Sequence, residues 1–217
     1  MNPIFDADCR RCPRLAAFLD AVHVEEPSYY CRPVPPFGDA RARLVLVGLA
    51  PGMHGANRTG RPFTGDHAGI LLYRTLYKFG LASGPESLAA DDGLELIDAR
   101  ITNSVKCLPP ANKPLPAEVK ECNAYLRAEL KASRDARVFL ALGAVAHAAV
   151  LRAFELRSAQ YPFAHGAQHA IGDSRVLLDS YHCSRYNTQT RRLTTPMFEA
   201  IIERARDLTF RAGGAHE

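Results

Sequence analysis

The feature that most constrains the fold of this chain is the alternation of short apolar runs with segments of helical periodicity. Four apolar runs predict strands, over 43–49, 99–107, 137–143 and 174–182. Four segments with apolar residues at helical spacing predict the helices that follow, over 68–81, 117–133, 144–154 and 195–209. Because such strands join through right-handed crossovers, the sequence predicts an α/β fold, one three-layer α/β/α domain over 1–217.

Residues at the predicted helix ends support these boundaries. A first helix is expected over 10–22, before a proline-rich turn. Glu118 lies in the first turn of its helix, where a carboxylate is favourable. Thr195 is expected to cap the last helix, with Pro196 at the first helical position.

Composition sets broad limits. The 217 residues are 47% hydrophobic and 23% charged, which is ordinary for one large globular domain. No apolar stretch reaches the roughly 18–20 residues that span a bilayer, and the N-terminus lacks a signal-peptide core. We therefore expect a cytoplasmic protein without a membrane partner. A net charge of +4 permits nucleic-acid binding without requiring it.

Long polar loops follow three of the four predicted strands, over 50–66, 107–116 and 182–194. The first belongs to GLAPGMHGANRTGRPFTGD (48–66), a stretch with five glycines. Long loops without secondary structure are uncommon and often functional. Because the carboxyl ends of parallel strands meet at one edge of a sheet, we expect the functional site there.

Four of the six cysteines form two pairs. Cys9 and Cys12 form a CxxC, and Cys107 and Cys122 flank a proline-rich segment. In a reducing compartment such a set favours a tetrahedral site for zinc or an iron–sulfur cluster over disulfides. Four unrelated buried thiols are the alternative. Cys31 and Cys183 are not expected to be ligands.

Three segments, GLAPGMHGANRTGRPFTGD, TNSVKCLPPANKPLP and YHCSRYNTQTRRLT, lie in order within this cysteine pattern. From about Cys9 to Phe198 the chain resembles the iron–sulfur branch of the uracil-DNA glycosylase superfamily, above all its fifth family, the B-type enzymes. The resemblance implies a four-stranded parallel sheet and excision of uracil, and of other deaminated bases such as hypoxanthine, from double-stranded DNA. It also implies a structural [4Fe–4S] cluster on Cys9, Cys12, Cys107 and Cys122.

The resemblance also implies roles for single residues. His182 would donate to the O2 oxygen of the departing pyrimidine, and Asn103 would bind the pyrimidine edge, since an amide both donates and accepts. Phe63 would stack on the base. The backbone at Gly48, Ala50 and Gly52 would approach the base closely. The alternatives are a capping histidine, a bonded strand asparagine and a core phenylalanine.

The sequence departs from the superfamily pattern at two positions. Ala50 stands where several families carry Asp, Asn or Glu, and an alanine cannot activate water. The fifth family shares this choice, so the catalytic acid is expected at Asp66, whose alternative role is to cap the next helix. The third motif commonly reads His-Pro-Ser, whereas Cys183 replaces the proline here, a change that would loosen the loop.

Basic residues near these motifs predict contacts with DNA. By resemblance, the loop that wedges into the duplex contains Ser184, Arg185, Tyr186 and Asn187. The expected positive rim comprises Arg58, Arg61, Lys106, Lys113, Arg191 and Arg192. Scattered surface charge is the alternative for each of them. A non-catalytic lesion-binding protein and an unrelated nucleotide hydrolase are the competing functions, and we expect a monomer.

Overall fold

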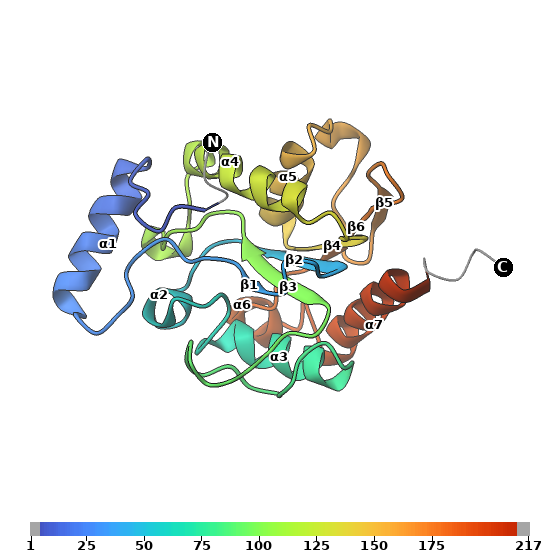
Figure 1. The fold of residues 1–217 in the computed structure, drawn as a ribbon, viewed down its shortest axis with the longest axis horizontal. Coiled ribbons are helices and arrows are strands. Elements are labelled where there is room, and N and C mark those ends of the chain that lie inside the picture. The colour runs from blue at the N-terminus through green and yellow to red at the C-terminus, as the bar shows by residue number, and fades with distance from the viewer. Residues whose placement is uncertain (1–4, 212–217) are drawn as a thin grey trace.

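The computed structural model of the protein describes residues 5–211 and contains one central sheet of six strands (Figure 1). Their spatial order is β1-β3-β2-β4-β6-β5. The strands are β1 Phe37–Gly38, β2 Leu44–Gly48, β3 Ala99–Asn103, β4 Val138–Leu142, β5 Gln168–Ala170 and β6 Val176–Ser180.

The four inner strands, β3, β2, β4 and β6, are parallel, as the sequence predicts. The two edge strands, β1 and β5, are antiparallel and were not predicted. They are two and three residues long, too short to give a periodic signal in the sequence. The sheet is therefore mixed, with the predicted four-stranded parallel sheet as its centre.

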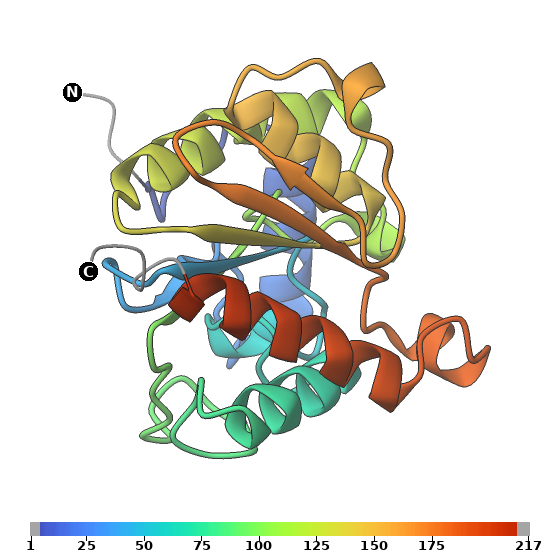
Figure 2. The same cartoon turned by 90° about the vertical axis from the view of Figure 1, so that its right-hand side faces the viewer.

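Helices cover both faces of this sheet, so the three-layer prediction is confirmed. Figure 2 shows α4 and α5 on one face and α3 and α7 on the other. The helices are α1 Pro13–Glu25, α2 Ala56–Thr59, α3 His67–Lys78, α4 Pro116–Ala132, α5 Ala144–Ala153, α6 Arg185–Gln189 and α7 Thr195–Arg211, with single 3₁₀ turns η1 Pro110–Asn112 and η2 Ser158–Gln160. Within residues 5–211, none of the helices is long and apolar enough to cross a membrane.

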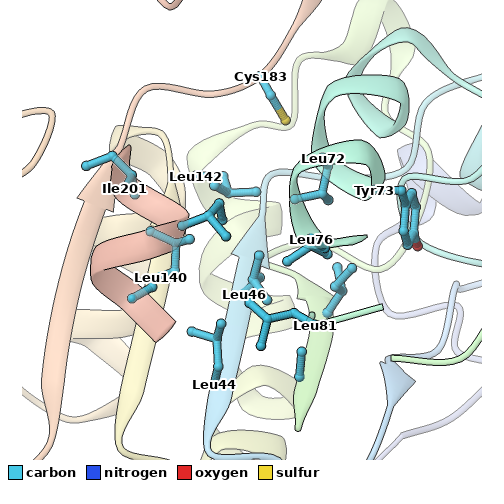
Figure 3. Packing of buried hydrophobic residues seen from close by; sticks show 14 of the residues in the cluster. Leu44, Leu46, Leu72, Tyr73, Leu76, Leu81, Leu140, Leu142, Cys183 and Ile201 are labelled. Carbon is cyan, nitrogen blue, oxygen red and sulfur yellow. The ribbon is translucent and has the colours of Figure 1, made fainter. Parts of the chain in front are cut away.

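Alternation along the strands divides the core into two layers. Leu44 and Leu46 of β2 face α3 and α7, where they belong to the same cluster as Leu72 and Ile201 (Figure 3). The intervening Val45 and Val47 face α4 and α5. Because both faces of β2 are buried, the strand reads as a continuous apolar run. This packing fixes the strand ends from which the site is built.

Several predicted boundaries are wrong. The second predicted strand ends at Asn103, so Cys107 lies in a loop beyond it. The first helix begins at Pro13, where a proline is readily accommodated, rather than at residue 10. The last helix is capped by Thr194 and not by Thr195, because the Thr194 Oγ1 accepts from the Met197 amide at 3.4 Å. The loops over 50–66 and 182–194 contain the short helices α2 and α6.

Candidate functional site

A cavity of about 1280 Å³ opens at the carboxyl edge of the sheet, where the long loops were predicted to meet. Its wall comes from the ends of β2 and β4, from the loop after β6 and from the start of α3. A cavity of this size exceeds the range of about 300–1,000 Å³ that is usual for small-ligand pockets. It has room for a nucleotide together with part of its backbone.

Packing is tight at the end of β2, where Gly48 and Asn103 lie against Phe63 but do not themselves line the cavity. A Cβ atom on Gly48 would lie 2.4 Å from Asn103 Oδ1 and 2.6 Å from Phe63 Cζ. Both distances are too short for any side chain, so the strand end needs a glycine there. Asn103 pairs with Gly48 across the parallel ladder, and its Oδ1 is buried without a hydrogen-bond partner among the described residues. We name Gly48, Asn103, Phe63 and His182 the base slot.

Phe63 and His182 form an aromatic pair in the base slot. Their ring centroids lie 5.8 Å apart at an interplanar angle of 26°. Phe63 has a φ of 55°, a conformation that bulky residues rarely adopt and that is found preferentially at functional sites. The side-chain amide of Asn187 donates to the backbone oxygen of His182 at 2.8 Å and holds the loop in place.

The electrostatic state of His182 follows from its surroundings. Burial lowers the pKa of the imidazole to about 4, so the ring is neutral at neutral pH. Its Nδ1 is buried without a partner in the described part of the chain. A neutral imidazole donates from one nitrogen and accepts at the other, so it can bind an oxygen atom without delivering a full charge.

Asp66 has two different oxygen environments. Its Oδ1 accepts from the Gly69 amide at 2.8 Å, so Asp66 does cap α3, the role given as the alternative to catalysis. Its Oδ2 faces the turn at Gly52 and Gly55, where a Cβ would lie 3.3 Å and 2.6 Å away respectively. Burial raises the pKa of this carboxyl, although the bond from Gly69 opposes the rise. One residue can therefore cap the helix and still present a carboxylate to the cavity.

The four predicted metal ligands lie together. Cys9, Cys12, Cys107 and Cys122 line one small cavity between α1, the loop after β3 and α4. The backbone amide of Lys106 donates to Cys122 Sγ at 3.3 Å, a bond typical of thiolates that hold metal. The donor set therefore fits a four-thiolate metal group.

Burial sets the protonation state of these thiols. Burial, and then the proximity of Cys122, raises the pKa of the Cys12 thiol to about 11. Burial also raises the pKa of Cys107 and Cys122. Without a metal the thiols would stay protonated, whereas a bound metal makes the thiolate the stable form. Cys31 and Cys183 lie elsewhere, buried in other clusters.

Two residues of the predicted positive rim are not on it. Arg61 is 5% exposed, binds Asp92 at 2.7 Å and lies over the Phe37 ring. Lys106 is 1% exposed and pairs with Glu129 at 2.7 Å. Both side chains stabilise the interior, so neither can contact a phosphate. Sequence spacing placed them near the site but could not show which way they point.

Of the remaining basic and wedge residues, some line the cavity and others are only exposed at the surface. Arg58 and Arg185 line it, and Tyr186 on α6 is 71% exposed. Ser184 caps α6 by accepting from the Asn187 amide at 3.4 Å. Three further basic residues, Lys113, Arg191 and Arg192, are exposed but do not line the cavity. Arg192 lies over the Tyr181 ring at 4.6 Å.

Sequence reasoning missed one wall of the cavity. Leu142, Gly143, Ala144 and Val145 line it from the end of β4. The loop there is short and its first residues after β4 are all apolar or glycine. A signal existed, since the carboxyl end of β4 meets the same sheet edge as its neighbours. Gly143 has a φ of 99°, and a Cβ there would lie 3.5 Å from the Cβ of His182.

Comparison with known proteins agrees with the fold and the site. The family model described as "Uracil DNA glycosylase superfamily" matches residues 35–206. With the parallel sheet and the cavity at its carboxyl edge, this match establishes that the chain belongs to the uracil DNA glycosylase superfamily.

Three relatives and one solved structure are similar to the chain. The chain is 48% identical to the Type-5 uracil-DNA glycosylase of Thermus thermophilus, over 92% of this chain and 93% of the relative. It is 44% identical to that of Pyrobaculum aerophilum, over 91% and 88%. The Type-4 uracil-DNA glycosylase of Archaeoglobus fulgidus is 35% identical, over 68% and 61%. Among solved structures, SMUG2 of Pedobacter heparinus has a TM-score of 0.49 at 16% identity, over 80% and 77%.

Proposed function

We propose that this protein is a DNA repair glycosylase that hydrolyses the N-glycosidic bond of uracil. The base slot carries the proposal, because it joins an aromatic face to two polar atoms, Asn103 Oδ1 and His182 Nδ1, that are buried without partners in the described structure. Buried polar atoms in native proteins nearly always have a partner, so a bound ligand is the natural one. The relatives named Type-5 uracil-DNA glycosylase support uracil as that ligand.

The base slot suits a flat ring with an NH group beside a carbonyl oxygen. The Asn103 amide can accept from the one and donate to the other. Phe63 offers a face on which the ring stacks, and the missing side chain at Gly48 lets Asn103 and Phe63 pack directly against the strand end. To reach this slot the nucleotide must leave the helix, which costs a few kcal/mol of stacking and pairing.

Two side chains would stabilise the charges that develop as the bond breaks. The neutral His182 donates to the base oxygen, where negative charge accumulates, and it is held in place before the reaction. The Asp66 Oδ2 faces the sugar as positive charge develops and orients the attacking water. Its raised pKa makes it a better proton acceptor than an ordinary aspartate.

Double-stranded DNA is the proposed partner, bound by a monomer. Tyr186 and Arg185, exposed at the start of α6, would fill the space that the extruded nucleotide leaves. Arg58, Arg191 and Arg192 would hold the phosphates. Hypoxanthine is proposed as a second substrate, since it also presents an NH group beside a carbonyl oxygen.

A [4Fe–4S] cluster is proposed as the cofactor, held by Cys9, Cys12, Cys107 and Cys122. When bound it supplies four metal–thiolate links that join α1 to the loop after β3 and to α4, and it takes no part in bond cleavage. The protein should be brown, with about four irons per chain. Stoichiometric zinc without visible absorbance would contradict this assignment.

A single assay tests the function. Duplex oligonucleotides with one uracil or one hypoxanthine are incubated with the protein and then treated with alkali, and a thymine duplex serves as the control. Strand breaks at the lesion after repeated turnover support the proposal. Tight lesion-specific binding without breaks would make the protein a lesion-binding module. Neither binding nor breaks would overturn both readings.

A further inference from the structure

A second cluster of titratable side chains lies on the other face of the sheet from α3 and α7. Asp179 is on β6, His147 is on α5, and His169 is on the edge strand β5. Their nearest ligand atoms lie within 4.8 Å of one another. None of the three lines the cavity that holds the base slot or the cavity that holds the cysteines.

The buried carboxylate of Asp179 needs a positive partner. The residue is 0% exposed, and within residues 5–211 its ion-pair contacts are to His147 and His169 alone. A buried carboxylate without compensation is costly, by several kcal/mol. Neither an arginine nor a lysine in the described structure forms an ion pair with it, so only the histidines or a bound cation can compensate the charge.

One half of the cluster has no hydrogen bonds. Asp179 Oδ1 lies 2.8 Å from His147 Nδ1, which is a normal hydrogen bond. Asp179 Oδ2 lies 3.5 Å from His169 Nε2, and both atoms are buried without a hydrogen-bond partner in the described chain. That separation is long for a hydrogen bond. It is close to the roughly 3.3 Å between two ligands of a tetrahedral zinc ion with bonds of about 2.0 Å.

The surroundings of His147 also suit a ligand. Its Nε2 lies 2.9 Å from the backbone oxygen of Tyr161 and its Nδ1 lies 2.8 Å from Asp179 Oδ1, so without an ion both nitrogens donate. Burial opposes the charged ring, but the bonds to Asp179 and Tyr161 raise the pKa of His147. An ion would replace the Nδ1 proton, while Nε2 would still donate to Tyr161 and hold the ring in place. Histidines that bind metals almost always donate their other ring nitrogen in this way. Only 13% of the His169 side chain is exposed, on the edge strand, which gives an ion a route in from solvent.

We propose that His147, His169 and Asp179 form a binding site for a divalent transition-metal ion such as Zn²⁺, distinct from the four-cysteine site. Two imidazoles and one carboxylate suit zinc better than magnesium or calcium, which prefer oxygen ligands throughout. Three protein ligands leave the fourth position to water. The ion would join α5, β5 and β6, and β6 leads directly to His182.

Calorimetric titration of Zn²⁺ into the iron-loaded full chain tests the site. We expect one ion per chain, and His169→Gln should bind it at least about tenfold more weakly. His165→Gln is the matched control, because this partly buried histidine precedes β5 and stacks on Tyr181 outside the cluster. It should bind zinc like the unchanged protein. Asp179→Asn should abolish binding if it folds, and His169→Gln carries the test if it does not.

Two further measurements separate this site from the cysteines. Iron content before and after the titration shows whether zinc has displaced the cluster. X-ray absorption at the zinc edge should show only nitrogen and oxygen ligands at about 2.0 Å, whereas the cysteine site would show sulfur at about 2.3 Å. Sulfur ligands, or equal zinc binding by His169→Gln and the unchanged protein, would overturn the proposal and leave a hydrogen-bonded cluster without metal.

Discussion

Two neighbouring buried regions differ in how far their polar groups are hydrogen-bonded. At Lys106 the ammonium has three acceptors for its three protons: Thr102 Oγ1 at 2.5 Å, Glu129 Oε2 at 2.7 Å and the Asn103 backbone oxygen at 2.9 Å. The ammonium is thus fully paired, although the second carboxylate oxygen of Glu129, Oε1, has no partner within the described residues. We call this the closed network. A few atoms away, in the base slot, Asn103 Oδ1 and His182 Nδ1 have no partner within the described residues.

The difference separates polar groups that stabilise the fold from those that are available to a ligand. Asn103 belongs to both regions, since its backbone oxygen is bonded by Lys106 while its side chain faces the base slot. The closed network therefore fixes the backbone from which the open amide projects. Changes in the closed network should affect unfolding, and changes in the open groups should affect the reaction.

The largest effect is expected from Lys106→Met, which leaves the buried Glu129 without its cation. Breaking a buried pair costs about 3–5 kcal/mol in the free energy of unfolding. Denaturant unfolding measures it, and Lys113→Met, an exposed lysine of the same segment, is the control with little expected change. Adding Glu129→Leu should recover much of the loss, since the unpaired charge is then removed. A small loss of stability in Lys106→Met would show that the closed network contributes little to the free energy of unfolding.

His182→Ala should slow single-turnover excision by about 10²–10³-fold, the usual cost of removing a preorganised donor. Because Nδ1 has no partner in the described chain, its removal leaves no buried group newly unpaired. Unfolding should therefore change far less than in Lys106→Met. His23→Gln, an exposed histidine on α1, should excise at the unchanged rate. If His182→Ala lost stability and activity in parallel, His182 would stabilise the fold in the way that the closed network does.

Asp66→Asn tests a residue that belongs to both classes. Loss of a helix cap costs about 0.5–2 kcal/mol, whereas loss of a catalytic acid costs about 10²–10⁴-fold in rate. Asparagine is itself a good cap, so we expect a stable, brown, DNA-binding protein that excises at least about tenfold more slowly. In the unchanged protein the rate should fall on acidification with an apparent pKa above that of ordinary Asp, because burial raises the pKa of Asp66. Near-normal excision by Asp66→Asn would limit this residue to capping.

A smaller effect concerns stability against pH. Burial lowers the pKa of His182 to about 4, below its unfolded value of about 6.5. The stability that depends on neutral His182 is present above about pH 6.5 and is lost as the pH falls toward 4. His182→Ala lacks this loss, so its melting temperature should fall less than that of the unchanged protein across this range. Parallel melting curves would argue against a buried neutral ring.

The smallest effect is expected outside both regions. Arg192→Ala should weaken binding to damaged and undamaged duplex alike and lower the salt slope by about one unit. Tyr186→Ala should weaken only the complex with an extruded nucleotide. If the two variants showed the same salt dependence of DNA binding, Arg192 and Tyr186 could not be assigned separately to phosphate contacts and to the wedge.

The sequence predicts the closed framework better than the orientation of single side chains. The inner strands and their helices follow from periodicity, because β2 and β4 are buried on both faces. The cysteine site and the cavity edge follow from motif spacing. Arg61 and Lys106 were assigned to the surface because a cation is normally solvated, and only tertiary packing shows that Asp92 and Glu129 are there to pair with them. The edge strands β1 and β5 are similarly fixed by their neighbours rather than by their own residues.

The six thiols differ in exposure, so the number that react with an alkylating reagent reports the state of the protein. Cys31 is 8% exposed and Cys183 is 0% exposed, and burial raises the pKa of both, which keeps them from reacting with alkylating reagents in the native state. Cys122 is equally buried at 8% exposure, whereas Cys9, Cys12 and Cys107 are partly exposed and would be masked only while the proposed cluster is bound. The number of carbamidomethyl groups found by mass spectrometry after brief native labelling should therefore report cofactor loss separately from unfolding, which alone would add Cys31, Cys122 and Cys183.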